Sequence, residues 1–207
     1  MAAQGFVAVV GSRVLPETAA GQVAAVVRFF LSRGWGIGSG GAPSADAYAL
    51  RAVVEAGAGA CARSVAFLPG KVPPQDQELQ RFVAHDGRVV AGAGDGRLAL
   101  LGRSRRLARE AAGVAAFLWG PSRGSAFTVR EAVRAGKPAA VVVAGGGAVL
   151  PVFPGGRWGP AGWAAPRRSD GSRPRRLRSW RGARGSRACS RCRRASPPTA
   201  SSSTSPR

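Results

Sequence analysis

The sequence predicts an α/β fold of the Rossmann-like type, with a mostly parallel sheet and helices on both faces. Between residues 5 and 150, short apolar runs alternate with longer amphipathic segments, which is typical of strands that alternate with helices. Several of the runs are apolar at every position, as expected for strands that are buried on both faces. The chain has 207 residues and 45% hydrophobic content, enough for one such domain and an additional segment.

The first elements follow directly from this alternation. The run FVAVV (6–10) predicts a buried strand that ends at Gly11. Residues 17–34 predict a helix because their apolar residues recur at helical spacing. WGIG (35–38) predicts a short strand, and residues 44–57 predict a second helix with Ser44 as its N-cap.

The later elements repeat the pattern. SVAFL (64–68) predicts a third strand, and residues 73–87 predict a loop that leads into a helix. RVVA predicts a short strand and residues 97–113 a helix. The last predicted strand, helix and strand lie at 114–119, between Gly124 and Gly136, and at 139–143.

The segment from residue 151 to 207 differs from residues 1–150. It contains 14 Arg, no Lys and one acid, whereas residues 1–150 contain 17 Lys and Arg and 9 Asp and Glu. It has no apolar periodicity and is rich in Ser, Pro and Gly, so we expect a disordered basic tail. Two origins remain open. The first is that the tail binds nucleic acid through its arginines, with Trp158, Trp163 and Trp180 stacking on bases. The second is that the tail is the product of a GC-rich gene translated in a wrong reading frame.

The net charge of +21 indicates a polyanionic partner. No stretch of about 18 apolar residues predicts a membrane span, and the N-terminus lacks the pattern of a signal peptide. We therefore expect a cytoplasmic protein without a membrane partner. Cys189 and Cys192 form a single C-x-x-C pair, which is too little for a zinc site, and no metal is expected.

Three strand ends carry turns of small residues, and two of these turns contain an arginine. Glycine lets a ligand approach the backbone, a helix N-terminus offers free N–H groups, and arginine binds phosphate through two hydrogen bonds. The turns therefore predict a site for DNA phosphate or for a nucleotide. The candidate residues in the turns are Gly11, Ser12, Arg13, Ser39, Gly40, Gly41, Arg123, Gly124 and Ser125.

A basic run at 102–110 adds Arg103 and Arg106 to the candidate residues. The run lies either on a helix face that is exposed to solvent or on a surface that binds successive phosphates of a nucleic acid. The first turn lacks G-x-G-x-x-G, and no G-x-x-x-x-G-K-[ST] loop is present, so neither a dinucleotide nor another cofactor is expected.

Evidence for catalysis is weak. Asp46, in the first turn of its helix, would orient a ribose or a backbone N–H, or only complement the helix dipole. His85 is expected at a helix end, and Glu131 is expected to pair with Arg134 on an exposed helix face. No nucleophile, base and orienting group occur together, so binding is favoured over enzymatic activity, which stays open.

Several spaced motifs resemble the DNA-processing protein A (DprA, or Smf) family. VAVVGSR at 7–13 resembles the family's V-A-I-V-G-S-R, and residues 38–57 resemble V-S-G-x-A-x-G-I-D-x-x-A-H-x-x-A-L-x-x-G. Residues 72–79 resemble Y-P-P-E-N-x-x-L, and residues 102–143 resemble R-N-R-I-I-A followed by S-G-S-L-x-T-A-R-x-A-x-x-x-G-R-x-V. The pattern departs at Ser44-Ala45-Asp46, which replaces G-I-D, and no histidine follows.

The resemblance implies a Rossmann-type domain over residues 1–150 that binds single-stranded DNA and helps to load a RecA-type recombinase during natural transformation. It adds Thr128 and Arg130 to the candidate binding residues and implies a homodimer. The wider superfamily also contains nucleotide-binding sensors and the LOG-type phosphoribohydrolases of nucleoside monophosphates. Hydrolysis of a nucleoside monophosphate is the second hypothesis. In the LOG signature P-G-G-x-G-T-x-x-E the glutamate follows the last glycine by four residues, whereas Glu131 follows Gly124 by seven.

Overall fold

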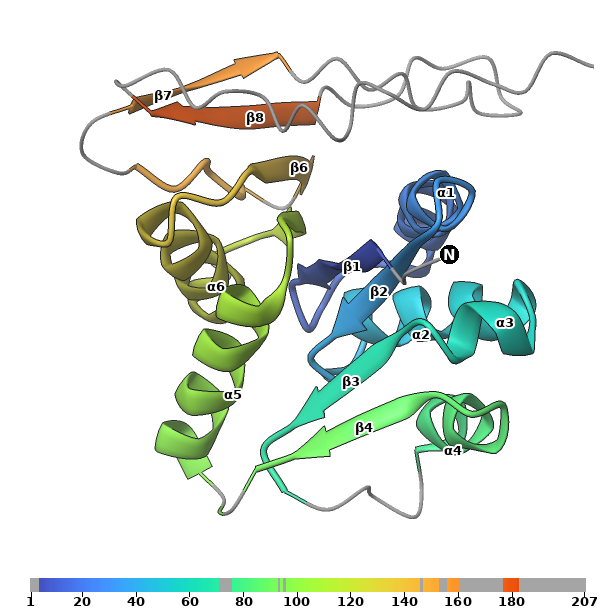
Figure 1. The fold of residues 1–207 in the computed structure, drawn as a ribbon. Coiled ribbons are helices and arrows are strands. Elements are labelled where there is room, and N and C mark those ends of the chain that lie inside the picture. Colours follow the sequence, from blue (N-terminus) through green and yellow to red (C-terminus); the bar gives the residue numbers. More distant parts are fainter. Residues whose placement is uncertain are drawn as a thin grey trace, which may run out of the picture.

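In the computed structural model, residues 4–70, 76–92, 94, 96–145, 147–152, 156–160 and 177–182 are described. They form an α/β fold in which helices cover both faces of one sheet (Figure 1). The strands are β1 (Gln4–Gly11), β2 (Trp35–Ser39), β3 (Val65–Leu68), β4 (Arg88–Ala91), β5 (Val114–Trp119), β6 (Ala139–Gly145), β7 (Gly156–Pro160) and β8 (Leu177–Gly182). The helices are α1 (Ala20–Leu31), α2 (Ala45–Glu55), α3 (Ala58–Cys61), α4 (Gln77–Ala84), α5 (Gly96–Glu110) and α6 (Arg123–Arg134).

The strand order is β4-β3-β2-β1-β5-β6-β8-β7. Strands β1 to β6 pair in parallel, and β8 pairs antiparallel with both β6 and β7. The chain first builds outward from β1 to β4 and then returns to place β5 on the other side of β1. The order therefore reverses between β1 and β5, which is where ligands bind in open parallel sheets.

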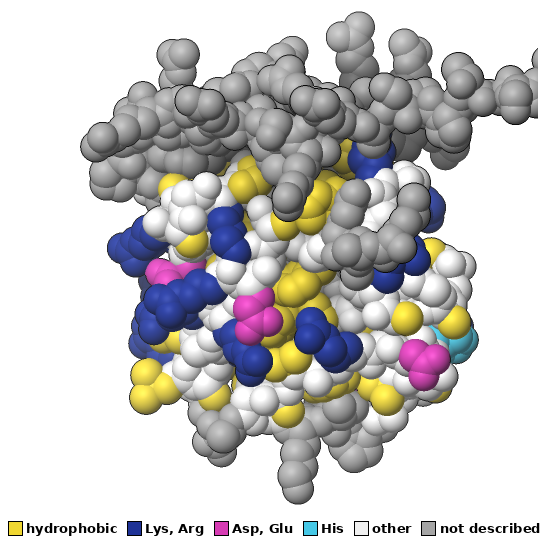
Figure 2. Space-filling model, in the orientation of Figure 1, with side chains coloured by type: hydrophobic (Ala, Val, Ile, Leu, Met, Phe, Trp, Pro, Cys, Tyr) yellow, Lys and Arg dark blue, Asp and Glu magenta, His cyan; other side chains and the backbone are white. Residues whose placement is uncertain are grey.

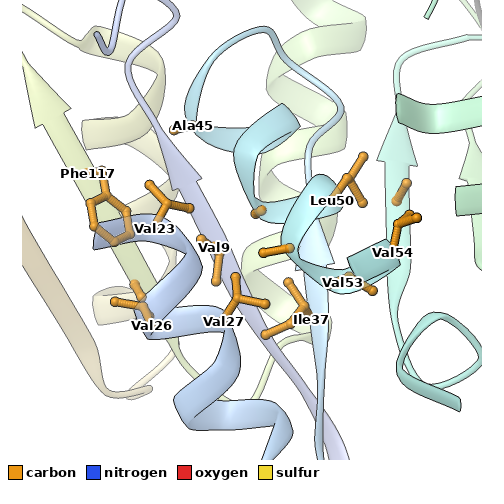
Figure 3. Close-up of a cluster of buried hydrophobic side chains, with 14 of the residues drawn as sticks. Val9, Val23, Val26, Val27, Ile37, Ala45, Leu50, Val53, Val54 and Phe117 are labelled. Carbon is orange, nitrogen blue, oxygen red and sulfur yellow. The ribbon is translucent and has the colours of Figure 1, made fainter. Parts of the chain in front are cut away.

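Residues 6–10 of β1 are all apolar because they pack against hydrophobic cores on both faces of the sheet. Along β1, Phe6, Ala8 and Val10 face the core formed with α5 and α6. Val9 faces the opposite core, where Val23 and Val27 of α1 and Leu50 and Val53 of α2 pack around it (Figure 3). Side chains alternate between the faces of a strand, so a strand that is buried on both faces has no polar position.

The structure confirms the predicted Rossmann-like fold and most of the predicted elements, and it differs at three places. The helix expected from residue 17 begins as a 3₁₀ turn at Glu17–Ala19. Ser44 precedes α2 with a φ of 63° and makes no side-chain cap. The short helix α3 follows Gly57, where the sequence indicated only a stop.

A further difference, beyond these three, concerns the segment expected to be a disordered tail. Two stretches of it, β7 and β8, are strands, and β8 pairs with β6, so the sheet continues beyond residue 150. Apart from residues 151 and 152, the rest of the segment, which includes Trp163, Cys189 and Cys192, lies outside the described residues. In the part of the chain that is described, no helix has the length and apolar character needed to span a membrane.

Gly36 offers a test of the packing between β2 and the loop before β3. A Cβ at this position would lie 1.8 Å from the carbonyl oxygen of Arg63, which is backbone and therefore cannot move aside freely. We expect Gly36→Ala to lower the free energy of unfolding by about 2–3 kcal/mol. The matched control is Gly21→Ala in α1, where a Cβ meets nothing within 4 Å and helix propensity improves. Urea denaturation of the two variants measures the difference, and equal stabilities would contradict the described packing.

Candidate nucleic-acid interface

A cavity of about 420 Å³ opens at the carboxyl edge of the sheet, at the point where the strand order reverses. On one side lies the loop after β1, and on the other side lie the loop after β5 and the first turns of α6. Asp46 and Arg103 line it from α2 and α5. The lining residues are Val10, Gly11, Ser12, Arg13, Val14, Ala42, Asp46, Arg103, Ser104, Leu107, Trp119, Pro121, Ser122, Arg123, Gly124, Ser125 and Thr128.

The loop after β1 is held by hydrogen bonds of two serines. Buried Ser12 donates its backbone N–H to the carbonyl of Phe117 (2.9 Å), and its hydroxyl accepts the N–H of Trp119 (2.8 Å). Ser44 donates its hydroxyl to the carbonyl of Arg13 (2.7 Å). This bond explains why Ser44 does not cap α2. The hydroxyl of Ser12 thus joins the ends of β1 and β5.

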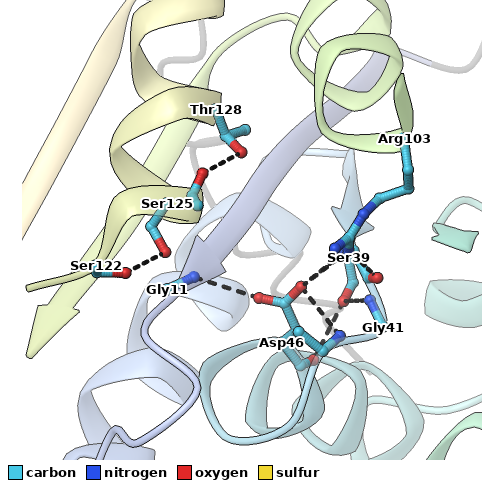
Figure 4. A network of polar contacts seen from close by, with 11 residues as sticks. Gly11, Ser39, Gly41, Asp46, Arg103, Ser122, Ser125 and Thr128 are labelled. Atoms are coloured by element: carbon cyan, nitrogen blue, oxygen red, sulfur yellow. Dashed lines mark hydrogen bonds and ion pairs between the residues drawn. The ribbon is translucent and has the colours of Figure 1, made fainter. Parts of the chain in front are cut away.

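The turn before α6 is organised by its own hydroxyl groups. Ser122 donates to the hydroxyl of Ser125 (2.8 Å), and Thr128 donates to the carbonyl of Gly124 (3.2 Å) (Figure 4). Gly120 has a φ of 61°, a conformation that favours glycine. At Gly124, however, an added Cβ would meet nothing within 4 Å. The space over this first turn of α6 is therefore open to a ligand.

The carboxylate of Asp46 connects the first two glycine turns (Figure 4). Oδ1 accepts the N–H of Gly11 (3.3 Å), and Oδ2 accepts the N–H groups of Gly40 (2.9 Å) and Ala42 (3.4 Å). The side chain is 4% exposed, and Oδ2 lies 3.9 Å from Nη1 of Arg103. Asp46 therefore orients backbone N–H groups, which is one of the two roles that the sequence suggested.

Arg103 is the buried partner of this carboxylate. Its Nη1 donates to the carbonyl of Gly40, and its side chain is 9% exposed. A Cβ on Gly40 would lie within about 3 Å of both Arg103 and Asp46, so a larger residue would displace these two side chains. Burial lowers the pKa of Arg103, the charge of Asp46 opposes that shift, and the positive charge of Arg13 adds to it.

Two more arginines stand at the cavity without a counter-charge. Arg13 and Arg123 are exposed, line the cavity, and form no ion pair with any described residue. Arg13 is also close enough to Arg103 to disfavour its charged form. An anion that bound between these guanidinium groups would relieve their repulsion. The arrangement is therefore suited to phosphate.

The structure brings most of the candidate residues together at this cavity. Those that line it are Gly11, Ser12, Arg13, Arg103, Arg123, Gly124, Ser125, Thr128 and Asp46. Ser39, Gly40 and Gly41 lie beside it, where Ser39 donates to the carbonyl of Asp46 (3.3 Å) and accepts the N–H of Gly41 (3.2 Å). Arg106 lines a second cavity, and Arg130 is exposed on α6 and lines neither.

Glu131 corrects an expectation from the sequence. It is 8% exposed and pairs with Arg105 of α5 (3.1 Å) as well as with Arg134 (3.1 Å). It joins two helices instead of lying on a solvated face, and it does not line the cavity. His85 ends α4, as expected, and is exposed.

Sequence reasoning did not assign Ala42, Trp119 or Ser122 to the site. Ala42 supplies an N–H to Asp46, and Trp119 supplies one to Ser12. Their contribution is made by the backbone, so the residue type carries no signal of it. Ser122 lies in the turn after β5, which the sequence analysis had selected as a candidate phosphate site. That position in the sequence was the signal that could have assigned Ser122 to the site.

Comparisons with known proteins agree with this fold. No family model matches the chain, and no curated protein matches it. Among solved structures, DNA processing protein A (DprA) from Streptococcus pneumoniae is similar with a TM-score of 0.55 and 24% identity, over 65% of this chain and 49% of that chain. The fold is similar to that of DprA.

A second DprA structure, from Helicobacter pylori, concerns single-stranded DNA binding. It matches with a TM-score of 0.54 and 20% identity, over 65% of this chain and 63% of that chain. The match thus spans less than two thirds of either DprA. These comparisons confirm the Rossmann-like fold that the sequence motifs implied.

The Asp46 network predicts a particular dependence of stability on pH. Burial raises the pKa of Asp46 from 3.8 to about 6, against the opposing effects of Arg103 and three backbone N–H groups. The folded state therefore binds this proton more tightly than the unfolded chain does. As the pH falls from about 6 to about 4, protonation of Asp46 should add up to about 3 kcal/mol to the free energy of unfolding.

Asp46→Asn provides the reference for this measurement, because every other titrating group is common to both proteins. Urea denaturation between pH 4 and 7 should show the wild type gaining stability over Asp46→Asn as the pH falls. A difference that stays flat or shrinks at low pH would mean that Arg103 and the N–H groups keep the carboxylate ionised.

Proposed function

We propose that this chain binds single-stranded DNA and that a backbone phosphate occupies the cavity between β1 and β5. The observation that carries the proposal is the pair of exposed arginines, Arg13 and Arg123, which face this cavity without a counter-charge among the described residues. Buried Arg103 adds a third positive charge. The three arginines supply positive charge for a phosphate, and the open first turn of α6 supplies backbone N–H donors.

The charge on the neighbouring surface supports a ligand that is longer than one phosphate. Lys and Arg side chains gather over α5 and α6, on the left of the view in Figure 2. The exposed arginines of these helices are Arg97, Arg105, Arg106, Arg109, Arg123, Arg130 and Arg134. A continuous polyanion would contact several of them, whereas a small anion would contact only those at the cavity. The fold similarity to the H. pylori DprA supports the same choice of ligand.

A mononucleotide is the second candidate, because a cavity of about 420 Å³ has the size of a small-molecule site. The positions of the two carboxylates do not favour hydrolysis of such a ligand. Glu131 lies between α5 and α6, and both oxygens of Asp46 accept backbone N–H groups. This candidate is therefore a binding site or sensor for a nucleotide, without assigned catalytic residues.

The family resemblance extends the proposal to a role in DNA recombination during natural transformation, with a RecA-type recombinase as partner and a homodimer as the assembly. Sedimentation of the full chain, alone and with a RecA-type protein and DNA, tests both points. A monomer at all concentrations that leaves the recombinase unaffected would remove this extension and leave DNA binding intact.

Charge-removing variants test the DNA site. We expect Arg13→Ala and Arg123→Ala each to weaken binding of a labelled oligothymidylate by about three- to tenfold. Each should also lower the slope of log K against log salt by about 0.7, since each removes one phosphate contact. Fluorescence anisotropy over a salt series gives both quantities. Arg63→Ala is the matched control, because Arg63 is exposed just before β3, at the opposite edge of the sheet.

Two outcomes would decide against the proposal. If Arg63→Ala reduces affinity as much as the cavity variants do, the binding is non-specific. If a mononucleotide displaces the oligonucleotide at equal concentration, the cavity is a nucleotide site and the longer strand adds nothing.

A further inference from the structure

Asp46 is an unusual residue for a site that binds anions. Of the described residues that line the cavity between β1 and β5, Asp46 is the only one with a carboxyl group. Its side chain is 4% exposed, so water does little to screen its charge. An anion that enters this cavity therefore meets the negative charge of Asp46 as well as the positive charges of the arginines.

The negative charge of Asp46 acts on Arg103. Oδ2 of Asp46 lies 3.9 Å from Nη1 of Arg103, and Nη1 also donates to the carbonyl of Gly40. Nε of Arg103 is buried and has no hydrogen-bond partner among the described residues, so this guanidinium keeps an unused donor. While Asp46 is ionised, its charge offsets that of Arg103. Once Asp46 is protonated, the full positive charge of Arg103 is available to an anion in the cavity.

The other charged groups near α2 lie either at the same cavity or away from it. Strands β1 and β2 and helix α3 pack against α2 and contain no charged side chain. Arg13 and Arg123 reach the cavity from the loop after β1 and from α6. Arg28 of α1 and Glu55 of α2 are exposed and do not line it. The remaining charged side chains of α2, α4 and the 3₁₀ turn pair with one another: Arg51, Glu17, Glu78 and Arg81.

Asp46 changes its charge in a range of pH where a bound phosphate affects it. Burial, the largest cause, raises the pKa of Asp46 to about 6, although Arg103 and three backbone N–H groups oppose the shift. A phosphate bound beside Arg103 adds a negative charge, which raises the pKa of a nearby carboxyl further. Proton uptake and phosphate binding therefore favour each other, and the effect has the same size in both directions.

We propose that Asp46 takes up a proton when a phosphate of the bound strand occupies the cavity, so that DNA binding is stronger in mildly acidic solution. This inference rests on the proposed function and adds its regulation by pH. The carboxyl group then has two roles, because it positions the loop N–H groups and its charge sets the affinity for phosphate. The affinity is highest below about pH 6, where the free protein already holds the proton, and falls as the pH rises through the higher pKa of the complex.

Asp46→Asn removes the titrating group, and Asp86→Asn is the matched control. Asp86 is exposed after α4, lines neither cavity, and has a φ of 63°, which asparagine also adopts. The probe is an oligothymidylate without terminal phosphates, because a terminal phosphate itself titrates near pH 6. Its fluorescent label is one that does not titrate between pH 5 and 8.

Fluorescence anisotropy with the full chain, at constant ionic strength, gives the affinity as a function of pH. The wild type and Asp86→Asn should bind the strand about tenfold more tightly at pH 5 than at pH 8. Asp46→Asn should keep at most about a twofold change, because it has no carboxyl group to protonate in the cavity. All other titrating groups are common to the wild type and Asp46→Asn.

Calorimetry on the wild type makes the test independent of how well Asp46→Asn folds. Heats of binding at pH 6.5 in two buffers of different ionisation enthalpy give the number of protons that are taken up. The wild type should take up about half a proton per bound chain. His85→Gln should take up the same number, since His85 is exposed and lines neither cavity.

The opposite results overturn the inference in distinguishable ways. If Asp46→Asn keeps the pH profile of the wild type, or if His85→Gln abolishes the proton uptake, another group titrates and phosphate binding stands. If the wild type takes up no proton and binds equally at pH 5 and pH 8, Asp46 and the phosphate are not coupled. If the wild type binds the strand at neither pH, the proposed function fails together with the coupling.

Discussion

The carboxylate of Asp46 fixes the relative positions of two strand-end loops and of helix α5. Its oxygens accept N–H groups from Gly11 after β1 and from Gly40 and Ala42 after β2, and Arg103 of α5 faces it. Burial of a charge is costly unless hydrogen bonds and an opposite charge compensate it. Gly11, Ala42 and Arg103 line the cavity, and Gly40 lies beside it. The same contacts that satisfy the carboxylate therefore shape the site, and a Cβ at position 40 would displace the side chains of Arg103 and Asp46.

The arginines of the site divide into two classes with different tasks. Arg103 is buried and held by the backbone and by Asp46, so it contributes charge at a fixed position. Arg13 and Arg123 are exposed at the mouth, where they remain free to adjust to a ligand. A ligand that entered the cavity from solvent would meet the exposed pair before the buried charge. This order suits a chain-like polyanion, whose backbone is attracted at long range and positioned at short range.

Local sequence patterns were sufficient for the fold and for predicting that most of the candidate residues gather at one edge of the sheet. Uninterrupted apolar runs such as residues 6–10 and 114–119 identify strands buried on both sides, and glycine turns after them mark the carboxyl edge. The patterns were not sufficient for the roles of individual charged residues. Asp46 and Gly11 are 35 positions apart, and Arg103 and Gly40 are 63 apart. Glu131 likewise has a partner on another helix. Such contacts depend on how the elements pack, which a helical spacing of three or four does not reveal.

The antiparallel strand β8 has a consequence for how a shortened chain would behave. It pairs with Ala140, Val141 and Val142 of β6 and so covers the N–H and C=O groups that would otherwise form the border of the parallel sheet. A fragment that ended at residue 150 would leave this border open, and uncovered borders of sheets join readily with those of other molecules. Self-association of such a fragment would then report on the lost strand. A measurement of the oligomeric state therefore has to include residues 177–182.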